Sequence, residues 1–275
     1  MSRIGCMQGR LVPPEPNRFQ SFPRSSWEKE FGLAQQAQLE CIEWIYDAYG
    51  EDVNPIQNDE GVKKILELSD KYGIKILSLC ADYFMDYPLL RLSEKQLDER
   101  MAKLIWLMQR CQLLGINRIV LPFVDSSKIE NESELHKVIS ILMNALSATT
   151  KTGIEIHLET SLDPMQYEKL LGGVADSRIK VNYDSGNSSS LGYYPYEEFA
   201  AYGDNIGSVH IKDRVRGGGT VPLGKGDVDF PSLFKCLKNI EYGGDYILQV
   251  ARGESGKEVS WARQNRAFVY NCLME

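Results

Sequence analysis

Short apolar runs alternate with amphipathic helical segments along the whole chain. This alternation is typical of repeated strand–helix units in which the strands pair in parallel. The apolar runs predict eight strands, at Arg3–Met7, Cys41–Tyr46, Ile74–Leu79, Arg118–Pro122, Ile154–Leu158, Ile179–Tyr183, Ile206–Ile211 and Tyr246–Val250. The amphipathic segments predict helices at Trp27–Leu39, Asp59–Tyr72, Ser93–Leu114, Glu132–Thr152, Met165–Leu171, Tyr196–Ala201 and Pro231–Leu237, with a last helix at Ser260–Met274.

Glycine follows three of the predicted helices. Gly73, Gly115 and Gly153 each stand between the end of a helix and the start of the next strand. A residue in the left-handed conformation often closes a helix at this position, and glycine adopts that conformation without steric cost. The glycines therefore support the predicted helix ends.

Two folds fit a series of strand–helix units. A doubly wound open sheet usually carries a GxGxxG turn after its first strand, whereas this chain continues there as MQGRLVPPEP. The length of 275 residues fits a barrel, which typically needs about 250. We therefore predict an α/β fold, a single (β/α)8 TIM barrel in which residues 1–275 form one domain, with the open sheet as the alternative.

Composition excludes several classes of protein. Hydrophobic residues make up 43% and charged residues 25% of the chain, which are ordinary globular values. A net charge of -7 argues against nucleic acid or an anionic membrane as partner. We find no apolar run long enough to span a bilayer, no signal-peptide pattern and no closely spaced cysteines. A soluble cytoplasmic protein with reduced thiols is expected.

Polar residues gather at the ends of the predicted strands. In a parallel barrel the carboxyl ends of the strands meet at one rim, where active sites lie. Polar residues also occur wherever strands reach solvent, so a single one carries little weight. The full set comprises Glu43, Asp47, Asp82, Asp125, His157, Glu159, Asp184, His210, Lys212, Asp213, Gln249 and Arg252.

Three of these residues form a donor set for a metal. Glu159, Asp184 and His210 offer two carboxylates and one imidazole, which suit Mn²⁺, Mg²⁺, Co²⁺ or Zn²⁺, and Gln249 would add a neutral oxygen. The alternative for His210 is an ordinary buried histidine. Residue types alone leave both open.

Five motifs carry a family resemblance. They are HLET at 157–160, YDSGN at 183–187, VHIKD at 209–213, VPLGKGDVDF at 221–230 and YILQVAR at 246–252. These motifs resemble the xylose isomerase-like TIM-barrel superfamily, and within it the sugar phosphate isomerases and epimerases, especially the pentulose-5-phosphate 3-epimerases. The resemblance implies a divalent metal held by Glu159, Asp184, His210 and Gln249. It also implies a sugar or sugar phosphate as substrate and a homodimer or homotetramer.

Gln249 departs from the family pattern. Related 3-epimerases have a second catalytic glutamate at this position, opposite the one that corresponds to Glu159. A glutamine neither accepts nor donates that proton at neutral pH, which argues against a symmetric two-glutamate epimerisation. With Glu159 as base and Gln249 beside it, a one-base isomerisation or a dehydration stays open, as does a non-catalytic sugar-binding barrel.

Other residues are candidates for binding substrate. Lys212 and Arg252 could hold substrate oxygens or phosphate, or form ion pairs with Asp213 or Glu254. Asn187 could bind a hydroxyl or cap its loop, and Glu43 lies at the rim. The glycine-rich run at 217–226 could cradle a phosphate through backbone N–H groups, or simply permit a tight turn.

Two further segments complete the predicted pocket. Cys80, Asp82 and Tyr83 follow the third strand and are expected to shape the pocket. The long first loop, PPEPNRFQSFP, is a candidate lid. The abasic-site endonucleases, which resemble this family in fold, use a histidine-rich cluster that a chain with only three histidines cannot build.

Overall fold

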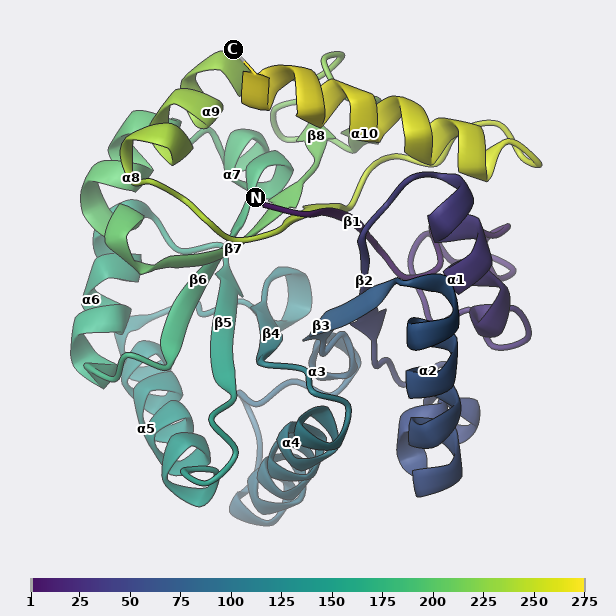
Figure 1. Cartoon of the computed structure of the whole chain (residues 1–275). Helices are drawn as coiled ribbons and strands as arrows, with labels where there is room; N and C mark the ends of the chain where they lie inside the picture. The colour runs from purple at the N-terminus through teal and green to yellow at the C-terminus, as the bar shows by residue number, and fades with distance from the viewer. Residues whose placement is uncertain (1, 275) are drawn as a thin grey trace.

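The computed structural model describes residues 2–274 and contains a closed barrel of parallel strands surrounded by helices (Figure 1). The strands follow one another around the barrel in the order β1-β10-β7-β6-β5-β4-β3-β2. Their bounds are β1 (Ile4–Met7), β2 (Cys41–Ile45), β3 (Lys75–Cys80), β4 (Arg118–Phe123), β5 (Glu155–Thr160), β6 (Ile179–Asp184), β7 (Ile206–Ile211) and β10 (Tyr246–Leu248).

The first strand closes the ring. Within β1, Gly5 pairs with Cys41 of β2 on one side and with Ile247 of β10 on the other, both in parallel register. A ring closed in this way has no edge strands, as a (β/α)8 barrel requires. The predicted TIM barrel is therefore confirmed, and the open doubly wound sheet is wrong.

Helices cover the outside of the barrel (Figure 1). In α2 (Asp59–Tyr72) the residues Val62, Ile65 and Leu68 form the buried stripe, at the spacing of an amphipathic helix. The remaining bounds are α1 (Trp27–Gln36), α3 (Tyr83–Asp86), α4 (Glu94–Leu113), α5 (Glu132–Ala148), α6 (Pro164–Val174), α7 (Ser185–Leu191), α8 (Pro195–Tyr202), α9 (Phe230–Asn239) and α10 (Glu258–Met274).

The predicted glycine positions adopt the expected conformation. Gly73, Gly115 and Gly153 have φ angles of 67°, 69° and 67°, which lie in the left-handed region. A side chain at these positions would be strained, so each glycine allows the chain to turn from a helix into the next strand.

Three elements near the rim do not appear among the predicted ones. They are α3, α7 and an antiparallel hairpin of β8 (Asp213–Arg214) and β9 (Thr220–Val221). The sequence of α7, SGNSSSL, is poor in helix formers and by itself predicts a loop. The Asp184 side chain caps this helix by accepting from the backbone N–H of Asn187 at 2.8 Å.

Among residues 2–274, no helix is long and apolar enough to cross a membrane.

Candidate active site

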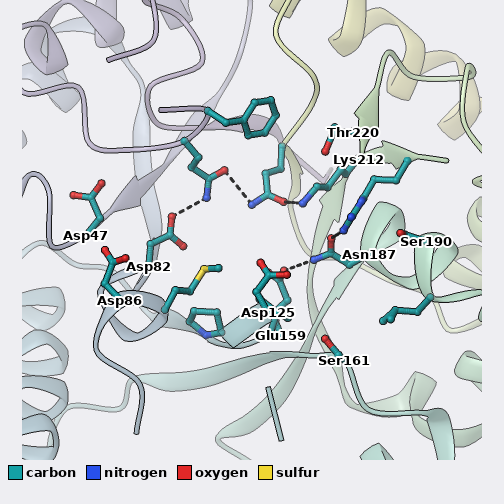
Figure 2. A pocket seen from close by; sticks show the side chains of 18 of the residues that line it. Asp47, Asp82, Asp86, Asp125, Glu159, Ser161, Asn187, Ser190, Lys212 and Thr220 are labelled. Carbon is teal, nitrogen blue, oxygen red and sulfur yellow. Dashed lines mark hydrogen bonds between the residues drawn. The ribbon is translucent and has the colours of Figure 1, made fainter. Parts of the chain in front are cut away.

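A polar cavity of about 500 Å³ lies at the carboxyl ends of the barrel strands. Figure 2 shows its wall, with Asp82 and Asp86 on one side and Asn187 and Lys212 on the other. The lining comes from the carboxyl ends of all eight barrel strands and the segments that follow them: Arg18, Phe19, Gln20, Asp47, Asp82, Met85, Asp86, Pro122, Val124, Asp125, Glu159, Ser161, Asn187, Ser190, Leu191, Lys212, Arg214, Thr220 and Gln249.

Glu159, which lines this cavity, lies close to the buried side chains of Asp184 and His210. One donor atom from each lies within 4.8 Å of the other two, and all three side chains are buried. The residues come from β5, β6 and β7, which are neighbours in the barrel, and Asp184 is the register partner of His210. The structure therefore brings together the three residues whose types suggested a metal site.

The ring of His210 is held with Nδ1 toward the two carboxylates. Its Nε2 lies 2.7 Å from Oε1 of Glu43, a fully buried carboxylate on β2. Its Nδ1 lies 3.4 Å from Glu159 Oε2 and 4.0 Å from Asp184 Oδ2. A carboxylate behind a histidine fixes the tautomer and leaves the other nitrogen for a metal. Glu43 is thus placed behind His210 and not in the cavity lining, where a substrate-binding residue was expected.

Charge around His210 determines its protonation. Burial lowers the pKa of His210, but the carboxylates of Glu43 and Glu159 outweigh burial and raise this pKa to about 10. Burial raises the pKa of Glu43, and the facing His210 more than offsets it, so the pKa of Glu43 ends below its ordinary value. In the metal-free protein the imidazole therefore carries a proton that a cation would replace.

Asn187 orients both carboxylates of the cluster. Its Nδ2 donates to Glu159 Oε1 at 2.6 Å, and its backbone N–H donates to Asp184 Oδ1. Its Oδ1 accepts from Arg214 at 2.9 Å. Asn187 was expected either to bind a substrate hydroxyl or to cap its loop. Its backbone N–H takes part in the cap of α7, and its side chain lines the cavity.

A chain of hydrogen bonds crosses the cavity from Lys212 to Asp82 (Figure 2). Lys212 Nζ donates to Gln249 Oε1 at 2.9 Å, Gln249 Nε2 donates to Gln20 Oε1 at 3.2 Å, and Gln20 Nε2 donates to Asp82 Oδ2 at 2.7 Å. Lys212 Nζ also lies 3.3 Å from Asp184 Oδ2. Gln249 thus faces the cavity, and its oxygen is engaged by Lys212.

Arg252 lies outside the cavity lining. Its guanidinium donates to the backbone carbonyls of Phe19, within the first loop, and of Val12, just before that loop. Arg252 therefore holds the predicted lid segment in place instead of reaching the cavity. It binds backbone carbonyls and does not form the ion pair with Asp213 or Glu254 that was the alternative. Phe19 and Gln20 of this loop line the cavity, so the loop does contribute to the site.

Asn182 and Ser208 extend the polar cluster into the barrel and were not singled out from the sequence. Asn182 Nδ2 lies 3.1 Å from both Glu159 Oε2 and His210 Nδ1, and Ser208 Oγ donates to Asn182 Oδ1. His157 Nδ1 lies 2.8 Å from Ser208 Oγ. A sequence pattern could have identified these residues: polar residues occupy every second position of three neighbouring strands. Alternate side chains of a strand share one face, so the pattern places these polar groups together.

Sequence comparison places the chain in a family. The sequence model of the family described as "Xylose isomerase-like TIM barrel" matches residues 31–272. The chain belongs to this family. A relative from Haemophilus influenzae, a putative L-ribulose-5-phosphate 3-epimerase SgbU, is 25% identical over 82% of this chain and 84% of its own length. The L-ribulose-5-phosphate 3-epimerase UlaE of Shigella flexneri serotype 5b is 23% identical over 82% of each chain.

Solved structures show the same fold at low identity. The IOLI protein, whose crystal structure contains a zinc atom, superposes with a TM-score of 0.79 at 17% identity and covers 98% of both chains. A D-allulose 3-epimerase from Methylomonas sp., solved with D-allulose, gives a TM-score of 0.72 at 17% identity, also over 98% of both chains. The similarity extends over nearly the whole xylose isomerase-like barrel.

Proposed function

We propose that this protein is a metal-dependent isomerase or epimerase that moves a proton on a carbon next to the carbonyl of a sugar. The observation that carries the proposal is the convergence of Glu159, Asp184 and His210, whose donor atoms lie within 4.8 Å of one another beside the cavity that Glu159 lines. The names of the curated relatives, which are sugar phosphate epimerases, support the same reaction class.

The residues fit a divalent cation. Two carboxylates and one imidazole nitrogen are a donor set for Mn²⁺, Mg²⁺, Co²⁺ or Zn²⁺. Glu159, Asp184 and His210 would hold the ion, and Gln249 is the candidate for a fourth oxygen. When bound, such an ion supplies Lewis-acid stabilisation of the negative charge that develops as a carbon next to a carbonyl loses its proton. The zinc in the IOLI structure is consistent with such a site.

Glu159 is the proposed base. Asn187 holds one oxygen of its carboxylate at 2.6 Å, and the side chain borders the cavity. Gln249, which accepts from Lys212 at 2.9 Å, cannot take up or return a proton at neutral pH. The pair therefore favours a one-base isomerisation, in which Glu159 removes the proton from one carbon and returns it to the neighbouring carbon.

Solvent exchange tests this function. The protein is loaded with Mn²⁺ and incubated with free and phosphorylated ketoses in deuterium oxide, and deuterium at carbon is followed by nuclear magnetic resonance. We expect incorporation in the wild type and a loss of about 100-fold or more in Glu159→Gln, the usual contribution of a general base. The matched control is Glu155→Gln, on the same strand but outside the cavity lining.

Other outcomes would identify other functions. Unchanged exchange in Glu159→Gln would contradict the proposed base. Ligand binding without any deuterium incorporation would point instead to a sugar-binding barrel, for which the missing carboxylate at Gln249 is the favouring observation. Loss of water from the ligand in mass spectrometry would point to a dehydratase that uses the same residues.

A further inference from the structure

The glycine-rich loop after β8 already encloses an anion that belongs to the protein. Asp213, which is fully buried, accepts from the backbone N–H groups of Lys225 at 3.1 Å, Gly226 at 2.9 Å and Val228 at 3.3 Å. A Cβ at Gly226 would collide with the Asp213 side chain and the Arg214 backbone, so the close approach requires glycine there. Backbone N–H groups converging on an anion are what a phosphate site needs. Here Asp213 uses them.

Other N–H groups of the loop are also engaged within the protein. Gly217 donates to the carbonyl of Ser190 at 2.9 Å, and Gly218 donates to the carbonyl of Val215 at 2.8 Å. The loop therefore folds on itself and on α7. The glycines of this run serve a tight turn, which was the alternative to a phosphate cradle, and they also allow the loop to enclose Asp213.

The cations near the cavity are engaged as well. Arg214 donates through Nε and Nη2 to the carbonyl of Gly218 and through Nη1 to Asn187 Oδ1. Lys212 contacts Asp184 and Gln249. Arg18 lies at the exposed mouth, with its guanidinium 4.1 Å from the centre of the Tyr49 ring. None of the three is arranged as a bidentate clamp for phosphate within the cavity.

Carboxylates line the opposite wall. Figure 2 shows Asp47, Asp82 and Asp86 close to one another on that side. Burial raises the pKa of Asp82 to about 6, and the nearby charges of Asp47 and Glu159 contribute to this rise. With Asp125 and Glu159, the lining carries five carboxylates against three cationic side chains. A phosphate dianion placed against Asp47, Asp82 and Asp86 would add to the repulsion among these three carboxylates, whereas sugar hydroxyls can donate hydrogen bonds to them.

We infer that the substrate of this cavity is an uncharged ketose and not a sugar phosphate. The inference rests on the proposed isomerase or epimerase function, which it narrows to one substrate class. It separates this chain from the curated relatives named for L-ribulose 5-phosphate.

Matched pairs of sugars test the inference. L-ribulose is compared with L-ribulose 5-phosphate, and D-allulose with its 6-phosphate, by solvent deuterium exchange with the Mn²⁺-loaded protein. We expect kcat/KM to favour a free ketose by about tenfold or more, because juxtaposed like charges weaken binding. We also expect inorganic phosphate to be no better an inhibitor than chloride at equal ionic strength. A preference for the phosphorylated member, or competitive inhibition by phosphate, overturns the inference.

Calorimetry with the same pairs separates this inference from the proposed function. Where no sugar exchanges deuterium, the proposed function fails, and binding alone decides the substrate class. Tighter binding of a free ketose than of its phosphate supports the inference. Equal or tighter binding of the phosphate, or no binding of any free ketose, overturns it.

Charge variants test the physical cause. The double variant Asp86→Asn with Asp125→Asn removes two carboxylates from the cavity wall, and we expect the ratio of phosphorylated to free ketose binding to rise several-fold. The control is Asp204→Asn, an exposed carboxylate just before the amino end of β7, at the other end of the barrel. An equal change of the ratio in the control, or no change in the double variant, would contradict repulsion by the wall.

Discussion

The Nε2–H of His210 donates to Oε1 of Glu43 at 2.7 Å, and both side chains are fully buried. The bond joins β7 to β2, which are separated in the barrel by β1 and β10, so it crosses the barrel interior. Because Nε2 is occupied, Nδ1 is the nitrogen that faces Glu159 and Asp184. One buried hydrogen bond thus determines which atom of His210 is offered to a metal.

Metal binding should release a proton. In the metal-free protein the pKa of His210 is raised to about 10, so at pH 8 the ring is protonated and a cation must displace that proton. We expect the apparent affinity for Mn²⁺ to rise about tenfold per pH unit between pH 6 and 9. Titration calorimetry in buffers of different ionisation enthalpy should count about one proton released. A count of zero at pH 8 would contradict the raised pKa.

Removing the charge of Glu43 should reduce this proton release. In Glu43→Gln the amide oxygen can still accept from Nε2–H, but the charge that raises the pKa of His210 is lost. We expect the number of protons released on Mn²⁺ binding at pH 8 to fall below about one half. The proton count is the readout because two opposite effects act on the apparent affinity for Mn²⁺: the proton competes less strongly, and His210 is a less basic ligand. The matched control is Glu155→Gln. Its carboxylate lies 2.9 Å from His157 Nε2, as that of Glu43 lies next to His210, but His157 is not a proposed metal ligand. A similar change in that control would indicate a general effect on the barrel.

A carboxylate at position 249 should restore a second proton-transfer group. In the wild type Gln249 Oε1 lies 2.9 Å from Lys212 Nζ, so in Gln249→Glu the new carboxylate can form an ion pair with Lys212. We expect epimer formation from a ketose substrate to increase by about 100-fold, the usual contribution of one acid–base group. The control Gln20→Glu adds the same charge next to Gln249. An equal gain in the control, or no gain in Gln249→Glu, would show that Gln249 does not lie on the reacting face.

The sequence predicted the barrel because each apolar run and each glycine-ended helix carries a local signal. It also predicted the cluster of Glu159, Asp184 and His210, because the ends of neighbouring parallel strands must converge. The partner of His210 could not be deduced, since Glu43 lies 167 positions away in the chain and only barrel closure brings the two together. The sequence made Arg252 a candidate for substrate binding because its true partners are also distant in the chain. No sequence pattern predicts that the backbone of the first loop passes next to Arg252.

Arg252 should control the order of the first loop without affecting the metal site. Its bonds to the carbonyls of Val12 and Phe19 hold a segment that lines the cavity. In Arg252→Gln we expect faster trypsin cleavage after the exposed Arg18 and a KM raised about tenfold, since each lost hydrogen bond is worth about 1 kcal/mol. Mn²⁺ affinity should stay unchanged. The control is Arg263→Gln, which loses a similar bond to the carbonyl of Gln36 away from the cavity. Unaltered cleavage and KM in Arg252→Gln, or a loss of metal affinity, would show that this arginine has another role.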